Sequence, residues 1–324
     1  MIDEKCSIKK YYAVKHKDDN IRANSRSGGV FTAISDYVFS LGGVVYGAKL
    51  NEDFTVSHKR AETKNNRNEF RGSKYVQSRL GNTFLSVEKD LNEDKTVLFS
   101  GTPCQVAGLV KFLKVNKTDT NKLFTLDIVC HGVPSEKVWI EYLNWIEKTH
   151  SKKIVKVDFR NKKDFGWADH IESVWFEDGS RFDGKYFRYL FYRHYILRPS
   201  CFKCKFKGNY LSDITIGDCW GIQNSHPEFN DNKGVSLVIP NTVKGEQVYN
   251  QIVKDIKVIE VKKDEVWQKP LFSSETPPSN REIFWKVFNK HSFKTVINKF
   301  SKDTFIVRVK IKLKKILKKL GVKL

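Results

Sequence analysis

Two apolar patterns alternate along the first 150 residues of the chain. Continuous apolar runs, typical of buried parallel strands, lie at 11–14, 44–50, 96–100 and 123–130. Apolar residues spaced three or four apart predict helices over 30–39, 104–113 and 136–147. This order of strand and helix predicts a mixed α/β fold with a parallel core sheet.

Beyond residue 150 the pattern changes to alternating apolar and polar positions. Residues 153–160 and 172–176 alternate in this way, and Glu177-Asp-Gly-Ser reads as a hairpin turn. Further strands are predicted over 213–218 and 234–240. We therefore expect additional antiparallel strands beside the parallel core.

The clearest break in the chain is Glu275-Thr-Pro-Pro-Ser. It leads us to expect three parts: an N-terminal part of the body over 1–95, a part carrying most cysteines over 96–280, and a basic tail over 281–324. The tail holds 14 Lys and Arg against two acidic residues, and so carries 12 of the 21 formal positive charges.

Within the tail, a helix over 305–320 would place six apolar residues on one face and lysines opposite. These are Phe305, Val309, Leu313, Ile316, Leu317 and Leu320. Such a helix fits the surface of an anionic membrane, and it also fits docking onto a protein. The early part alternates and would suit a strand. Nucleic acid is the least supported partner, because the rest of the chain is only moderately basic.

The compartment decides how the six cysteines are interpreted. No run of about 18 apolar residues suggests a membrane span, and the first ten residues lack the apolar core of a signal peptide. We therefore expect a cytoplasmic protein, in which cysteines serve metal binding, catalysis or packing rather than disulfides.

Four cysteines form a candidate metal site. Cys201 and Cys204 make a C-x-x-C pair, a spacing that lets two thiolates reach one metal or cluster. Cys104 and Cys130 each follow an apolar parallel strand, where the carboxyl ends of strands face a binding crevice. One close pair plus two distant cysteines favours iron–sulfur over zinc, although zinc could use the same thiolates. A metal-free pair and a thioredoxin-like redox pair remain less favoured alternatives.

The other cysteines have simpler interpretations. Cys104 itself could instead be a nucleophile, since a helix N-terminus lowers the pKa of a thiol. Cys219 is expected to be a packed core residue, because free cysteine is among the most buried residue types. Cys6 is assigned no role.

Seven motifs occur in an order that resembles the coenzyme F420 hydrogenase/dehydrogenase beta-subunit family, over about residues 10–275. They begin at Ser27-Gly-Gly-Val-Phe-Thr-Ala, Arg71-Gly-Ser-Lys-Tyr-Val-Gln-Ser, Phe99-Ser-Gly-Thr-Pro-Cys-Gln, Asp127-Ile-Val-Cys-His-Gly-Val-Pro, Arg198-Pro-Ser-Cys-Phe-Lys-Cys, Ser212-Asp-Ile-Thr-Ile-Gly-Asp-Cys-Trp-Gly and Asp231-Asn-Lys-Gly-Val-Ser-Leu-Val.

The resemblance implies an oxidoreductase that passes electrons between a 4Fe-4S cluster, FAD and a hydride-carrying or organic substrate. It places Cys104, Cys130, Cys201 and Cys204 as the cluster ligands and leaves Cys219 without such a role. Relatives occur in organisms without the deazaflavin coenzyme, including in surface-polysaccharide gene sets, so the substrate is not fixed.

One departure from the family concerns further clusters. Many relatives begin with a cysteine-rich, ferredoxin-like module, whereas this chain has only Cys6 before Cys104. We therefore expect a single cluster and a separate ferredoxin-like electron partner.

Within this family pattern the flavin site can be predicted. Ser27, Gly28 and Gly29 precede a helix, whose N-terminal N–H groups suit a diphosphate; alone they would read as an ordinary helix cap. Lys74 could place a cation near the phosphates or the ring, or be merely solvated. Thr102 caps the helix that carries Cys104, and we expect it to contact the cofactor.

Two further residues are candidates for the chemistry. His131 could donate a proton because histidine titrates near neutral pH, although a turn residue bonded to the backbone is the simpler interpretation. Asp218 could bond the flavin or cap a turn. The competing function for the whole chain is a zinc-stabilised basic protein that binds a membrane surface or nucleic acid without redox chemistry.

Overall fold

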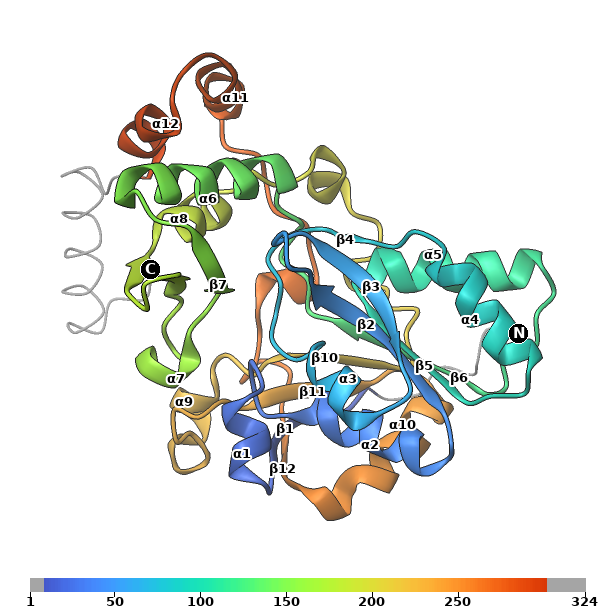
Figure 1. Ribbon diagram of the computed structural model, residues 1–324. Coiled ribbons are helices and arrows are strands. Elements are labelled where there is room, and N and C mark those ends of the chain that lie inside the picture. Colours follow the sequence, from blue (N-terminus) through green and yellow to red (C-terminus); the bar gives the residue numbers. More distant parts are fainter. Residues whose placement is uncertain (1–8, 302–324) are drawn as a thin grey trace.

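The computed structural model describes residues 9–301 of the chain. They form a nine-stranded mixed sheet and a three-stranded antiparallel sheet (Figure 1). The spatial order of the large sheet is β12 (Ile256–Val261), β1 (Tyr11–His16), β11 (Ser236–Pro240), β10 (Ile214–Asp218), β6 (Leu123–Ile128), β5 (Val97–Gly101), β2 (Val44–Leu50), β3 (Val56–Ala61) and β4 (Ser78–Arg79).

The centre of the large sheet is parallel, as the order of strand and helix predicts. The β2–β5, β5–β6 and β6–β10 pairs are parallel. The β10–β11, β11–β1 and β1–β12 pairs are antiparallel. The predicted mixed α/β class is therefore confirmed, and the carboxyl ends of β5, β6 and β10 meet at one edge.

Helices cover both faces of this sheet, because alternate residues of a strand point to opposite sides. On one face of the sheet, Val45 packs into an apolar cluster with α2 (Val30–Ser40) and α10 (Val243–Ile252). On the other face, Tyr46 packs with α4 (Thr83–Asn92) and α5 (Pro103–Val115).

The small sheet belongs to a second, aromatic-rich part of the core. Its antiparallel pairing and the turn between β8 and β9 agree with the alternating pattern beyond residue 150. It consists of β7 (Ile154–Asp158), β8 (Glu172–Phe176) and β9 (Arg181–Gly184), and it packs with α6 (Glu136–His150), α8 (Tyr186–Tyr192), α11 (Arg281–Lys290) and α12 (Phe293–Phe300).

Residues 281–301 pack against this second core. Phe284 is fully buried and stacks on Tyr195, with ring centroids 5.3 Å apart. Figure 1 shows α11 and α12 beside α6, at the opposite end of the molecule from α4. The predicted amphipathic segment over 305–320 lies outside the described residues.

Short helices and turns connect the longer elements of the described fold. They are α1 (Asp19–Ala23), α3 (Lys64–Asn68), α7 (Lys162–Phe165) and α9 (Ile222–Ser225), with 3-10 turns at Pro199–Lys203, Pro227–Phe229, Val253–Asp255 and Lys269–Leu271. Across residues 9–301, no helix combines the length and apolar character needed to cross a bilayer.

Glu172 is a carboxyl group buried inside the second core. It is 1% exposed, and it accepts hydrogen bonds from the Arg188 backbone N–H at 2.5 Å and the Tyr142 hydroxyl at 3.4 Å. Burial raises its pKa to about 8, because desolvation disfavours the charged carboxylate.

This burial predicts a pH-dependent stability. The pKa of Glu172 is higher in the folded protein than in the unfolded chain, where a glutamate has a pKa of about 4.3. Its contribution to stability is complete below that value and is lost as the pH rises toward 8. In urea denaturation across this window, Glu172→Gln should reduce the fall in unfolding free energy by about 1 kcal/mol per pH unit. Identical slopes for the two proteins would contradict the prediction.

Candidate functional site

A cavity of about 540 Å³ opens where the carboxyl ends of the parallel strands meet. Its wall includes Gly101 of β5, Ile128 of β6 and Gly217 of β10. Open α/β sheets bind ligands at this edge, and the volume lies within the range of small-molecule sites. The fold therefore places a ligand-sized cavity at the edge where the sequence predicts one.

Three of the four predicted ligand cysteines line this cavity. Cys104 lies in the first turn of α5, Cys130 follows β6, and Cys201 lies in the turn at Pro199–Lys203. Cys204 immediately follows that turn. Burial raises the pKa of Cys130 to about 12, and neighbouring Cys104 and Cys201 add to the rise.

Cys201 lies close to both Cys104 and Cys204. Burial raises the pKa of its thiol, and both Cys104 and Cys204 raise it further. Such mutual effects require thiols close to one another. The structure thus brings Cys104, Cys130 and the Cys201–Cys204 pair near one another from three separate points of the sequence.

Donors and cations surround these sulfur atoms. The Val133 N–H donates to Cys201 Sγ at 3.3 Å, and the Thr102 hydroxyl lies 3.2 Å from Cys104 Sγ. Lys207 and the Gly132 N–H act to lower the pKa of Cys130. These groups stabilise negative charge on sulfur, the form in which cysteine binds metals.

Cys219 lies apart from this group. Its side chain is fully buried in an apolar cluster with Trp167 and Tyr210, and burial raises the pKa of its thiol to about 12. Its surroundings are those of a packed core residue. Cys6 lies outside the described residues.

The loop over Ser27–Gly29 reaches the cavity at the start of α2. Ser27 and Gly29 line the cavity, and Gly29 caps the helix with a φ of 90°, a conformation that favours glycine. The N–H groups of Val30 and Phe31, at the first two helical positions, have no acceptor within the helix. This end of α2 can therefore donate to an anion.

Gly28 has a different position from its neighbours. Its N–H donates to Ser236 Oγ at 2.9 Å, and a Cβ at this position would lie 2.1 Å from the carbonyl oxygen of Val14. It does not line the cavity. Gly28 lets the loop pass close to β1 and β11, and its N–H is already used.

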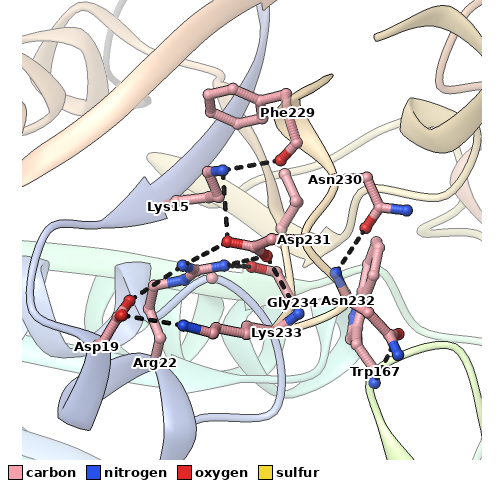
Figure 2. A network of polar contacts seen from close by, with 12 residues as sticks. Lys15, Asp19, Arg22, Trp167, Phe229, Asn230, Asp231, Asn232, Lys233 and Gly234 are labelled. Atoms are coloured by element: carbon pink, nitrogen blue, oxygen red, sulfur yellow. Dashed lines mark hydrogen bonds and ion pairs between the residues drawn. The ribbon is translucent and has the colours of Figure 1, made fainter. Parts of the chain in front are cut away.

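An ionic network around the buried Arg22 side chain supports this loop. Figure 2 shows Arg22 reaching Asp231, with nitrogen–oxygen distances of 2.6 and 2.9 Å. Burial acts to raise the pKa of Asp231, but the Arg22 guanidinium lowers it overall. Lys162 adds hydrogen bonds to the carbonyl oxygens of Arg22, Ser27 and Lys233. Lys162 thereby links the loop to the segments around Arg22 and Lys233.

Cations lie at the same end of the cavity. Arg71 donates from Nε to Thr32 Oγ1 of α2 at 3.0 Å. Lys74 donates to the carbonyl oxygens of Glu69 and Arg71 at 3.0 and 2.9 Å, and burial lowers its pKa to about 7. Arg26 also lines the cavity. Of these three residues, Lys74 was predicted from the sequence as a cofactor contact, and Arg71 only as part of a motif.

Asp218 fixes the positions of an arginine and a tryptophan next to the cavity. Its two carboxylate oxygens accept from Arg160 at 2.9 Å and from the Trp167 indole at 2.8 Å. Trp167 stacks on Trp220 at 4.6 Å, and the Arg160 guanidinium lies 5.1 Å from the Trp220 ring. Since both oxygens are engaged, Asp218 positions Arg160 and Trp167.

His131 lines the cavity and begins a polar chain leading away from it. Its Nε2 lies 3.0 Å from Nε2 of His194, and both imidazoles lie within 4 Å of Glu275. Burial lowers the pKa of His131. Lys269 lies 2.7 Å from Glu275, so four ionisable groups lie together beside the cavity.

One residue of the site gave no signal in the sequence. Arg160 lies after β7 and is held at the cavity by its bond to Asp218 at the end of β10. Trp220 belongs to the motif that contains Asp218, but no local pattern predicts its stacking on Trp167. Arg71 could have been found, since a basic residue in a glycine-containing motif is a candidate phosphate ligand.

Comparison with known proteins now identifies the family. Residues 94–266 match the family described as the C-terminal region of the beta subunit in coenzyme F420 hydrogenase/dehydrogenase. The chain belongs to this family, which confirms the resemblance seen in the motifs. The matched stretch contains the four clustered cysteines, His131 and Asp218.

A solved structure of a hydrogenase complex is similar in fold. It is a chain from the xenon-derivatised F420-reducing nickel–iron hydrogenase complex of Methanosarcina barkeri, with a TM-score of 0.55 and 18% sequence identity. The likeness covers 91% of this chain and 92% of that one. No curated protein compared with the chain matches it.

Proposed function

We propose that the protein is an oxidoreductase that passes electrons between a 4Fe-4S cluster, FAD and a small-molecule substrate. One observation carries the proposal: three clustered cysteines and the open N-terminus of α2 line the same cavity. A thiolate centre and an anion-binding helix end in one cavity suit a metal cluster beside a phosphate-bearing cofactor. Membership of a family of hydrogenase and dehydrogenase subunits supports it.

The four cysteines have the chemistry that a cluster requires. Burial raises the pKa of the Cys130 and Cys201 thiols, which therefore hold their protons in the absence of metal, and iron would displace those protons. The N–H groups of Val133 and Gly132 would then face thiolate sulfur. Cys104, Cys130, Cys201 and Cys204 are accordingly the proposed ligands.

The anion-binding end of the cavity has the chemistry that the diphosphate of FAD requires. Ser27, Gly29 and the first N–H groups of α2 would hold it, with Arg71, and Lys74 in its protonated form, supplying positive charge. Bound FAD would supply the change between one- and two-electron transfer. Thr102 caps α5 with its hydroxyl beside Cys104 Sγ, and Asp218 holds Arg160 against the cavity.

His131 is the proposed proton-carrying residue. It lines the cavity, and its Nε2 lies within hydrogen-bonding distance of His194. A proton taken up or released at this imidazole can pass to His194, which lies near Glu275. A hydride-carrying substrate, of the deazaflavin type or another organic class, needs such a proton path.

An anaerobic reduction experiment tests the proposal. Reduced methyl viologen added to the purified protein should bleach flavin absorbance near 450 nm. The same sample should give a low-temperature electron paramagnetic resonance signal from a reduced cluster. A screen of organic and deazaflavin acceptors can then identify the substrate class by reoxidation. A colourless protein containing zinc would instead support the competing binding function.

A separate electron carrier is the proposed partner. The chain has six cysteines, and the proposed cluster uses four. The remaining two, Cys6 and Cys219, are too few for a second cluster held by four thiolates. We propose that electrons enter or leave through another protein, for which a ferredoxin-like carrier is the simplest class.

Membrane contact through the basic tail is a separate proposal. A helix over 305–320 would place six apolar residues on one face and lysines opposite, a pattern that binds anionic lipid. Protein ending at Ser301 should lose sedimentation with vesicles of 30% anionic lipid, while the full chain sediments and is released by salt. Equal binding of both proteins would reject the proposal.

A further inference from the structure

A basic groove adjoins the candidate cofactor cavity. It has a volume of about 640 Å³ and lies between β4, the start of α6, the segment before Cys201, and α11. Gln77, Ser78, Pro134 and Arg198 line both the groove and the cavity. Arg198 is three residues before Cys201, and its carbonyl accepts from the Cys201 N–H at 2.9 Å. The groove therefore opens beside the proposed cluster.

The charge of the groove is strongly positive. Its lining contains four basic residues, Arg79, Lys137, Arg198 and Arg281, against one acidic residue, Glu136. Glu136 is paired with Arg79, and Lys137 and Arg198 are exposed. Lys203 and Lys205, exposed in the cysteine segment, extend the same charge. A surface of one sign attracts a partner of the other sign and speeds their encounter.

One wall of the groove comes from outside the family match. Arg281 and Trp285 belong to α11, beyond residue 266 where the match ends. Arg281 donates to the Leu197 carbonyl at 2.7 Å and lies 5.5 Å from the Trp285 ring. Arg and Trp are enriched at the centres of protein interfaces. The C-terminal helices thus add an interface-like wall beside the cysteine segment.

We propose that this groove docks a small acidic electron-carrier protein of the ferredoxin class. The proposal rests on the proposed function, because it places the carrier beside the cluster formed by Cys104, Cys130, Cys201 and Cys204. The transfer is a single electron: the reduced carrier is oxidised by one electron, the cluster is reduced by one, and no bond or proton is exchanged. An acidic protein fits because its charge complements the groove and its size covers both the groove and the cysteine segment.

Stopped-flow mixing with a reduced, acidic bacterial ferredoxin tests the proposal on the full chain. The test variant is Arg79→Glu/Lys137→Glu, at two exposed groove positions. The matched control is Lys257→Glu/Lys262→Glu, which makes the same charge change at exposed positions on or just after β12, at the opposite edge of the large sheet. Iron and flavin contents should be equal in all three proteins.

At low ionic strength the groove variant should be reduced by ferredoxin about tenfold more slowly, and the control at nearly the wild-type rate. The difference should shrink in 0.5 M salt, since salt screens the attraction. Reduced methyl viologen should act equally on all three proteins. Equal ferredoxin rates for the two double variants would overturn the docking site alone. Failure of viologen to reduce the wild-type protein would overturn the proposed function as well.

Discussion

Replacing Cys201 with serine should remove most of the bound iron from the anaerobically purified protein. Burial raises the pKa of the Cys201 thiol, and the neighbouring Cys104 and Cys204 raise it further. A serine hydroxyl is a poor iron ligand, and its hydrogen bond from the Val133 N–H would face oxygen rather than sulfur. We expect bound iron to fall at least fivefold, with the broad absorbance near 400 nm lost in proportion. Cys204→Ser should act in the same way.

The chain provides a matched control for this substitution. Cys219 is also buried, and burial raises the pKa of its thiol too, but it packs in an apolar cluster away from the other four. Cys219→Ser should leave the iron content unchanged. Iron measured by colorimetric assay and mass spectrometry distinguishes the two results. Unchanged iron in the Cys201 and Cys204 variants would refute this ligand set.

Replacing Arg71 with methionine should weaken FAD binding by about 10- to 100-fold. Arg71 lines the cavity beside the N-terminus of α2 and is held there by Thr32. A charge-assisted hydrogen bond to a phosphate contributes about 1.5–3 kcal/mol. Methionine keeps much of the side-chain volume and removes the charge. The dissociation constant can be measured from the quenching of FAD fluorescence on addition of flavin-free protein.

Two further variants test whether the positive charge of Arg71, rather than the loss of any arginine, determines the affinity for FAD. Arg71→Lys should recover part of the affinity, because a positive charge is restored without the planar guanidinium. Arg181→Met removes an arginine from the small sheet, where it pairs with Asp164 and Asp183. It should leave the affinity for FAD unchanged. Equal dissociation constants for wild-type protein and Arg71→Met would remove Arg71 from the proposed phosphate site.

Much of the sheet could be predicted because its strands are apolar and its helices have clear periodicity. Strands β5 and β6 are continuous apolar runs. Helix α5 begins after Thr102 with Pro103, which together are a strong signal for a helix N-terminus. Their parallel pairing follows from the order of the elements. The same reasoning placed Cys104 and Cys130 at one edge of the sheet.

Other elements could not be predicted because tertiary contacts determine them. β12 is half exposed and contains charged residues, and its partner β1 lies more than 200 residues away. The order of strands on this side, β12–β1–β11–β10, depends on pairings across most of the chain. No local pattern encodes such pairings.

The candidate site, too, could be predicted only in part. The motifs indicated the loop at Ser27–Gly29, yet the unavailability of the Gly28 N–H depends on its contact with Ser236 in a distant strand. Asp218 was foreseen as a possible flavin contact, whereas its bond to Arg160 requires the second core to pack against β10. Local signals identify individual residues, but the packing decides which of their atoms face the cavity.

The most direct test of the central claim is an iron, sulfide and flavin analysis of the full chain purified without oxygen. The proposed function predicts about four iron and four sulfide per chain, together with about one FAD released on denaturation. It also predicts broad visible absorbance that reduced viologen bleaches. A colourless protein containing zinc and no flavin would contradict it.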